Sequence, residues 1–238
     1  EHWQFTQQGL IGGQDLGSLR VVKVSSLLVH VLSVSSLKGG VGKTTSAIET
    51  GTHLALFGFS VLLIDLDPQG DLSQGVGYDP EMTEAHAASA NMPLDAIVRN
   101  SFANLFDIPR FYDPVDMEQV IKKPYGEMGP HIIPADVFLQ EFEDVINIQP
   151  NKEKLISTLL QRARMGALKN FDTSKYDFIV FDCAPGNSVL MKNALLASDY
   201  VIAPVALSIF STKGLSRFSR ALISMEDTFG IAPQPFVV

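Results

Sequence analysis

The sequence has little that would build a disulfide-stabilised or membrane-spanning protein. Its 238 residues include a single cysteine, Cys183, which excludes an internal disulfide and a cysteine-based zinc site. A chain without disulfides is typical of a reducing cytoplasm, so we expect a cytoplasmic protein. No apolar run reaches the roughly 18 residues needed to span a bilayer. The longest candidate, 21–37, is interrupted by Lys23, His30 and several serines, and no signal peptide is predicted at the N-terminus.

Positive charge is also scarce. Asp and Glu outnumber Lys and Arg by 26 to 18, which leaves a net charge of −8. Such a chain repels nucleic acid and anionic lipid unless a local basic patch overrides the overall field. The candidate patch consists of Lys213, Arg217 and Arg220, which fall on one stripe of a predicted helix. A DNA-binding stripe and an ordinary solvated helix face share this spacing, so both interpretations stay open.

Short β-branched apolar runs alternate with longer helical patterns along the chain. The pattern predicts strands at 28–36, 61–64, 132–133, 178–181, 200–205 and 236–238, and helices at 44–57, 137–146, 153–168, 189–197 and 215–229. Strands that are apolar throughout are buried on both faces, which is typical of a parallel sheet covered by helices. The sequence therefore predicts an α/β fold, a doubly wound and mainly parallel sheet with its ligand at the carboxyl ends of the strands.

The domain organisation predicted from these patterns is simple. No linker rich in Pro, Gly or Ser divides the chain, so residues 21–238 are predicted to form one domain. Residues 1–20 are predicted to be a flexible N-terminal extension. The less regular, proline-containing stretch 78–130 is predicted to be a helical insertion over one edge of the sheet.

A glycine-rich segment, KGGVGKTT at 38–45, follows a predicted strand and opens a predicted helix. Backbone N–H groups in such a turn, with the positive end of the helix dipole, bind phosphates. We expect Lys43 to reach the β- and γ-phosphates of a nucleotide and the Thr44 hydroxyl to ligate Mg²⁺. The expected nucleotide contacts are the whole segment: Lys38, Gly39, Gly40, Val41, Gly42, Lys43, Thr44 and Thr45.

One position of this segment departs from the usual P-loop pattern. Leu37 stands where that pattern has a glycine, and a second lysine, Lys38, follows it. The arrangement resembles the deviant Walker A box of the ParA/MinD ATPases. In that family the extra lysine reaches across a two-fold axis to the partner's nucleotide, and the resemblance implies this role for Lys38. A cation supplied in trans can contribute roughly 10³–10⁵ in rate, and the dimer would be isologous.

Two predicted strands deliver carboxylates to the same edge of the sheet. Asp65 and Asp67 follow 61–64 within the run DLDPQG, and residues two apart point to the same side of a strand. This run resembles the ParA/Soj branch, which implies that Asp67 orients or activates the attacking water and that Asp65 lies near the Mg²⁺ shell. Asp182 ends the apolar run 178–181 as in a Walker B strand, and we expect it to hold Mg²⁺ through water. The alternative for these aspartates is that they have no role in binding: Asp65 and Asp67 would be solvated loop residues, and Asp182 would cap the end of a strand. Cys183, directly after Asp182, is predicted to be a packed residue rather than a reactive thiol.

The resemblance covers about residues 28–238 and implies a function. It implies a P-loop ATPase that uses ATP and Mg²⁺, with Lys38, Lys43 and Asp67 as its catalytic residues. The ATP-bound homodimer would bind DNA non-specifically. If the basic stripe is a DNA-binding surface, Lys213, Arg217 and Arg220 would make the contacts. A ParB-like or other cargo adaptor would then stimulate hydrolysis. We therefore expect a partition ATPase that segregates DNA or another cargo in a bacterial cytoplasm and associates with the nucleoid, without stable membrane association.

Two other functions within the superfamily stay open at this point. A MinD-like, membrane-associated regulator of cell division would need an amphipathic C-terminal helix. A metal-cluster scaffold would need paired cysteines, which a single Cys183 disfavours. In this family more helices follow the strand expected at 236–238, so the C-terminal part of the domain is expected to be incomplete, and no residue is assigned to the adenine.

Overall fold

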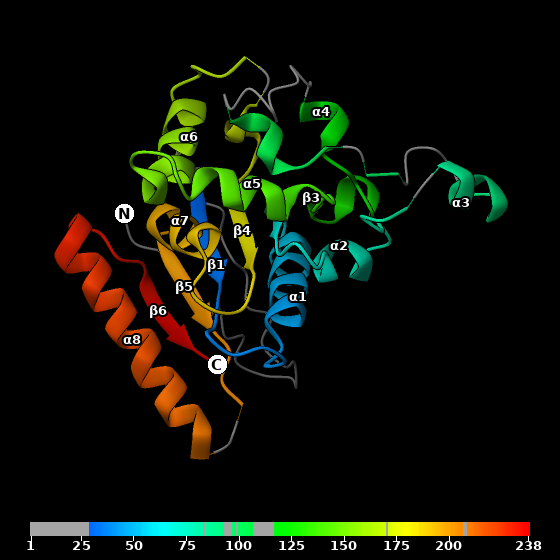
Figure 1. Cartoon of the computed structure of the whole chain (residues 1–238). Coiled ribbons are helices and arrows are strands. Elements are labelled where there is room, and N and C mark those ends of the chain that lie inside the picture. The colour runs from blue at the N-terminus through cyan, green and yellow to red at the C-terminus, as the bar shows by residue number, and fades with distance from the viewer. Residues whose placement is uncertain are drawn as a thin grey trace, which may run out of the picture.

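The centre of the molecule is a six-stranded parallel sheet (Figure 1). The computed structural model describes residues 29–82, 84–92, 97–98, 100–106, 117–169, 171–206 and 209–238. The strand order is β3-β2-β4-β1-β5-β6, and every neighbouring pair is parallel. The bounds are β1 (His30–Val34), β2 (Val61–Leu66), β3 (His131–Ile133), β4 (Phe178–Cys183), β5 (Tyr200–Ala203) and β6 (Gln234–Val237). Because later strands add on both sides of β1, the sheet is doubly wound, which confirms the predicted fold class.

Helices cover both faces of this sheet. They are α1 (Lys43–Leu56), α2 (Asp71–Gly75), α3 (Glu84–Ser89), α4 (Met117–Val120), α5 (Leu139–Ile146), α6 (Leu155–Arg164), α7 (Val189–Ala197) and α8 (Ile209–Phe229). Single 3₁₀ turns lie at η2 (Phe102–Leu105), η3 (Gly126–Met128), η4 (Lys152–Lys154) and η5 (Thr173–Lys175). None of the helices in the described residues is both long and apolar enough to cross a membrane.

The two faces of the sheet have separate apolar cores because side chains alternate along each strand. On one face, Leu63 of β2 packs in a cluster with Ala47 of α1. On the other face, Leu62 and Ile64 of the same strand belong to the larger cluster, which includes Phe142 of α5 and Leu195 of α7. All six residues of β2 are buried. A strand that is apolar on both sides can therefore be stable only in the middle of three layers.

The region 78–130, predicted as a helical insertion, is described in pieces. It contains α3, η2, α4 and η3, together with an antiparallel bridge between Lys122 and Ile132 at the β3 edge of the sheet. Phe102 of η2 is fully buried and makes an edge-to-face contact with Phe181 of β4, with ring centroids 6.0 Å apart. Part of the region thus belongs to the core. The predicted extension at 1–20 lies outside the described residues.

The register of the central strands decides where the site forms. Asp65 of β2 is the direct neighbour of Asp182 of β4, and β1 pairs with β4 on its other side. All three strands run in the same direction, so their carboxyl ends meet at one edge of the sheet. The loop that follows β1 and leads into α1 lies at the same edge. The fold therefore brings the glycine-rich segment and both carboxylate-bearing strands together.

Candidate functional site

The loop between β1 and α1 has the geometry of an anion-binding turn. Gly42, the N-cap of α1, has φ 86° and ψ 25°, a left-handed conformation that glycine adopts without a steric cost. No side chain caps α1, so its first backbone N–H groups point out of the helix without a side-chain acceptor. A Cβ added at Gly39, Gly40 or Gly42 would meet no protein atom within 4 Å. The space in front of these glycines is therefore open, as a phosphate cradle requires.

Lys43, at the end of this loop, is the charged group that acts electrostatically on the carboxylates. It is 7% exposed although it is the first residue of α1. Its positive charge lowers the pKa of both Asp67 and Asp182 against the effect of burial. The structure thus brings together Lys43, Asp67 and Asp182, which come from three separate parts of the chain.

Asp182 is a buried carboxylate with unmet hydrogen-bonding capacity. It is 1% exposed, and neither of its carboxylate oxygens has a hydrogen-bond partner in the described part of the chain. Burial and the neighbouring Asp65 raise its pKa to about 7, while the nearby Thr44 hydroxyl and Lys43 act in the opposite direction. Thr44 lies close to Asp182 but does not reach it with normal hydrogen-bond geometry. A buried acceptor of this kind needs a proton or a cation.

The donor set at this point fits Mg²⁺ bound together with a phosphate. Mg²⁺ prefers hard oxygen ligands, and it is commonly held by one or two protein oxygens plus the phosphates of its substrate. Thr44 and Asp182 supply a hydroxyl and a carboxylate of this kind. The described residues contain no group of three or more His, Cys, Asp or Glu side chains that could hold a metal ion. A site that relies on substrate oxygens therefore suits this chain better than an all-protein metal cage.

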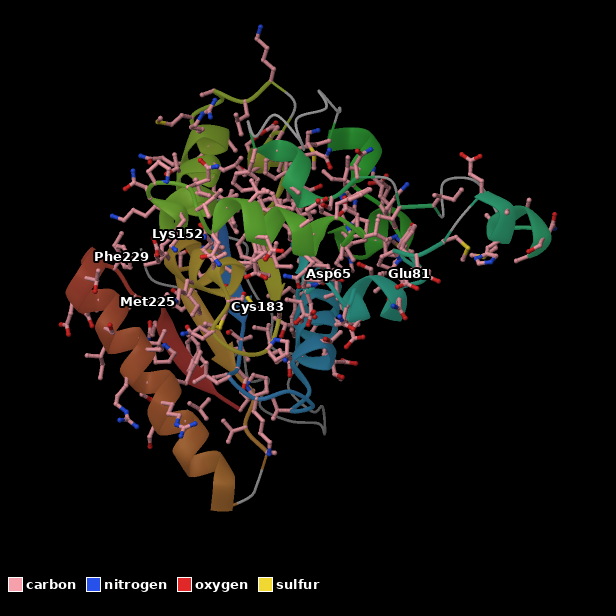
Figure 2. The ribbon with its side chains drawn as sticks, viewed as in Figure 1. Asp65, Glu81, Lys152, Cys183, Met225 and Phe229 are labelled. Atoms are coloured by element: carbon pink, nitrogen blue, oxygen red, sulfur yellow. The ribbon has the colours of Figure 1, made fainter. Side chains whose placement is uncertain are left out.

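Asp65, whose position is labelled in Figure 2, has its hydrogen-bonding capacity satisfied by the protein itself. Its Oδ2 accepts hydrogen bonds from the Ser73 hydroxyl at 2.6 Å and from the Ser73 N–H at 2.9 Å. Its Oδ1 accepts from the Asp67 N–H at 3.1 Å. The Ser73 hydroxyl also accepts from the Ala135 N–H just beyond β3. Complete burial raises the pKa of Asp65 to about 6, although these hydrogen bonds lower it. The Mg²⁺ role expected for Asp65 stays a prediction, and its geometry suits an anchor between β2, α2 and β3.

Asp67 lies in a tight turn that closes around it. Its Oδ1 accepts a hydrogen bond from the Gln69 N–H at 3.0 Å, and the side chain is largely buried. Burial raises its pKa, and the charges of Asp71 and Glu143 add to that rise. Gly70 ends the turn at φ 66°, and a Cβ there would lie 2.5 Å from Pro80 Cγ. The glycine of the DPQG run is therefore required by the shape of the turn, which holds Asp67 at the site.

Glu143 and Ser73 are parts of the site that the sequence did not predict. Glu143, on α5, is 9% exposed, and its Oε1 accepts a hydrogen bond from the Leu190 N–H in the first turn of α7 at 3.3 Å. Its charge contributes to the raised pKa of Asp67. The only sequence clue to Glu143 is an acidic residue beside the apolar stripe of α5. Nothing in the sequence singles out Ser73.

The remaining predicted residues lie on the surface. Lys38 is exposed, and its side chain has no ion pair in the described ranges. Arg217 and Arg220 are exposed on α8, where the Arg220 Nε–H donates to the Ser216 carbonyl at 3.2 Å. The side chain of Lys213 lies outside what the structure describes. Cys183 is buried and its thiol pKa is raised by burial, which confirms the prediction of a packed cysteine.

Comparisons with known proteins show the family and the fold of the chain. The family model described as AAA domain matches residues 29–231. The sporulation initiation inhibitor protein Soj of Bacillus subtilis is 30% identical over 187 residues, which cover 79% of this chain and 62% of Soj. The chain thus spans 62% of the length of this curated relative.

Two solved structures share the fold. A plasmid partition protein from Borrelia burgdorferi has a TM-score of 0.63 and 28% identity, covering 88% of this chain and 77% of that chain. Cobyrinic acid a,c-diamide synthase from Mycobacterium smegmatis, with bound ADP and magnesium, has a TM-score of 0.67 and 25% identity, covering 88% of this chain and 72% of that chain. The chain belongs to the family that the AAA domain model describes, and within it to the ParA/Soj group of the ParA/MinD superfamily.

Proposed function

We propose that this protein is an ATP-dependent, dimerising partition ATPase that positions or segregates DNA or another cargo. The observation that carries the proposal is the pair of buried oxygens of Asp182, which have no hydrogen-bond partner among the described residues and lie near Lys43 of the open glycine-rich loop. A structural carboxylate would be hydrogen-bonded, as Asp65 is. An open acceptor in this place is suited to the Mg²⁺ of a nucleotide. The similarity to a plasmid partition protein from Borrelia burgdorferi supports the cargo assignment.

The residues of the site take different roles in this proposal. The segment 38–45 binds the phosphates through its backbone N–H groups and Lys43, while Thr44 and Asp182 hold Mg²⁺. Mg²⁺, when bound, neutralises charge on the β- and γ-phosphates. Asp67 orients or activates the water that attacks the γ-phosphate. Asp65 fixes the end of β2 near the Mg²⁺ site through the three hydrogen bonds that its oxygens accept.

The exposed Lys38 acts across the dimer. Lys38 is exposed, whereas Lys43 of the same loop is buried and its charge lowers the pKa of Asp67 and of Asp182. In a two-fold dimer, each Lys38 can reach the γ-phosphate of the other subunit. The ATP-bound dimer then doubles the number of exposed Arg217 and Arg220 side chains that can face DNA. A ParB-like adaptor would reset the cycle by stimulating hydrolysis in the bacterial cytoplasm.

Replacing Asp67 tests its role in hydrolysis. We expect Asp67→Ala to bind ATP normally and to accumulate as an ATP-bound dimer, because water positioning is lost while the phosphate loop is intact. Nucleotide affinity, steady-state ATP hydrolysis and molar mass by light scattering would be measured. Lys43→Ala is the comparison variant, and it loses nucleotide binding itself. Hydrolysis by Asp67→Ala at the wild-type rate would refute the assignment.

Mixing two inactive variants tests whether Lys38 acts in trans. We expect Lys38→Ala alone and Asp67→Ala alone to lose hydrolysis, by up to roughly 10³-fold for the lysine. In a mixed dimer, the Lys38→Ala subunit keeps its own Asp67 and receives the partner's lysine, so one of the two sites is complete. An equal mixture is expected to recover about a quarter of wild-type activity if the subunits pair at random. Failure of the mixture to recover activity, with mixed dimers shown to form, would exclude the in-trans role.

The pKa of Asp182 predicts the pH dependence of stability without nucleotide or Mg²⁺. Because the folded-state pKa of Asp182 is about 7 and the ordinary pKa of an aspartate is 3.8, the folded chain binds the proton more tightly than the unfolded chain. The stabilisation is complete below about pH 4 and is lost as the pH rises through about 7. We expect Asp182→Asn to flatten this dependence between pH 5 and 8 and to gain about 2–4 kcal/mol at pH 8 in urea unfolding.

An exposed aspartate gives the matched control for that measurement. The pKa of Asp172 is lowered by hydrogen bonds from Ser174, so Asp172→Asn is expected to leave the slope between pH 5 and 8 unchanged. If wild type and Asp182→Asn show the same slope over this range, Asp182 is not the uncompensated buried charge that the proposal requires.

DNA binding is expected to depend on ATP and on the basic face of α8. We expect the wild-type protein to be retained on DNA at low salt with ATP and Mg²⁺ but not with ADP. The double variant Arg217→Ala/Arg220→Ala removes four charges per dimer, so the slope of log affinity against log salt is expected to fall by up to roughly 3–4. Arg162→Ala, at an exposed arginine outside α8, is the control. Active ATP hydrolysis without ATP-dependent retention would refute the DNA-binding part of the proposal.

A further inference from the structure

A hollow lies at the amino ends of the parallel strands, at the opposite end of the sheet from the nucleotide loop. Val61, the first residue of β2, and His131, the first residue of β3, both line it. The nucleotide loop follows the carboxyl end of β1, so the two sites are separated by the length of the parallel strands. The hollow has a volume of about 650 Å³. That volume falls within the range of roughly 300–1,000 Å³ typical of small-molecule sites.

The hollow has one apolar wall and one polar wall. Ala55 and Leu56 of α1, with Phe59, contribute apolar surface, and Met128 lies on the rim with its side chain 88% exposed. The residues that line the polar wall include two lysines, Lys123 and Lys175, and one carboxylate, that of Glu127. Two further carboxylates lie close to this lining: Asp177 Oδ2 accepts a hydrogen bond from the Ser60 N–H at 2.8 Å, and the charge of Lys175 lowers the pKa of Asp172. The two lysines can contact an anionic group, and the apolar wall favours a ligand with an apolar body.

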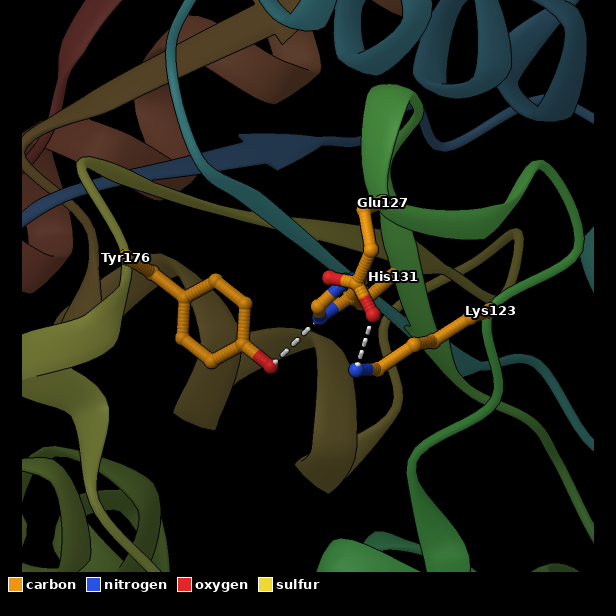
Figure 3. Close-up of polar contacts among 4 residues, drawn as sticks. All are labelled: Lys123, Glu127, His131 and Tyr176. Atoms are coloured by element: carbon orange, nitrogen blue, oxygen red, sulfur yellow. Dashed lines mark hydrogen bonds and ion pairs between the residues drawn. The ribbon is translucent and has the colours of Figure 1, made fainter.

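The polar wall already holds one carboxylate, which comes from the chain itself (Figure 3). Lys123 Nζ donates to Glu127 Oε1 at 2.7 Å, and His131 Nε2 lies 3.8 Å from Glu127 Oε2. On its other side, His131 Nδ1 is hydrogen-bonded to the Tyr176 hydroxyl at 3.0 Å. Tyr176 is only 7% exposed, whereas the Glu127 side chain is 77% exposed. The ring of His131 is therefore fixed from within, while the carboxylate that it faces can swing into solvent.

We propose that this hollow is a binding site for a small amphiphilic anion, a carboxylate, sulfonate or phosphate attached to an apolar ring or chain. The anionic group takes the position that the Glu127 carboxylate occupies and contacts Lys123 and His131, with Lys175 beside it. The apolar part lies on Ala55, Leu56 and Phe59. Glu127 acts as an internal competitor, because its carboxylate must move aside when the ligand binds.

This arrangement predicts opposite effects for two substitutions. Anilinonaphthalene sulfonate, an aromatic sulfonate that fluoresces in apolar surroundings, serves as the probe for fluorescence titration of the full chain. Lys175→Met removes an attracting charge, and we expect it to weaken probe binding about 3–10-fold. Glu127→Gln removes the competing carboxylate and releases Lys123, so we expect it to tighten binding by a similar factor. The uncharged N-phenylnaphthylamine, titrated in the same way, is expected to respond to neither substitution.

Three controls assign the probe to this hollow. Lys169→Met, at an exposed lysine that does not line it, is expected to leave probe binding unchanged. Ala55→Phe fills the apolar wall without changing charge and is expected to weaken both probes. Urea unfolding of each variant verifies that it is folded. Equal shifts for Lys175→Met and Glu127→Gln, no shift for either, the same response with the neutral probe, or displacement of the sulfonate by ADP with Mg²⁺ would each overturn the proposal.

Discussion

Two aspartates that lie side by side on buried parallel strands are the constraint on which the structure depends. Asp65 and Asp182 are direct neighbours in the register of β2 and β4, and both are essentially without exposure to solvent. Two buried carboxylates so close together cannot both be ionised unless each is compensated. The protein compensates Asp65 with three hydrogen bonds, two of them from Ser73, whereas the described part of the chain offers no hydrogen-bond partner to the oxygens of Asp182. This difference separates an anchoring carboxylate from one that is available to a cation.

The rest of the fold arranges charges around that open carboxylate. The left-handed Gly42 starts α1 so that its positive end faces the same edge of the sheet, and it brings Lys43 into range of Asp67 and Asp182. Gly70 closes the turn after β2 and keeps Asp67 beside this group. Glu143 links the site to the first turn of α7, the helix that follows the Asp182 strand. The residues proposed to hold phosphate, metal and water therefore come from α1, the turn after β2, and β4, whose positions are set by packing of the sheet.

Sequence patterns predicted the architecture because the decisive features were local. Continuous apolar runs identified the buried strands, and the helix over 189–197 has the same bounds in the structure as in the prediction. Helix α8 begins at Ile209, whereas the predicted helix began at 215. The prediction placed the helix start directly after Gly214, but a glycine is tolerated within a helix.

The site could be predicted in part. The expected gathering of Lys43, Asp67 and Asp182 followed from their positions after parallel strands. The roles of Ser73 and Glu143 could not be predicted, since each depends on a partner distant in sequence, at Ala135 and Leu190 respectively. The hollow at the opposite edge was missed for the same reason.

The most direct test of this account is a crystal structure of the protein with a non-hydrolysable ATP analogue and Mg²⁺. The account predicts a two-fold dimer in which residues 38–45 wrap the phosphates, Mg²⁺ lies between Thr44 and Asp182, and Asp65 keeps its hydrogen bonds to Ser73. It also predicts Lys38 of each subunit beside the γ-phosphate bound to the other. A nucleotide bound away from residues 38–45, or a metal held by Asp65 with Asp182 unengaged, would contradict it.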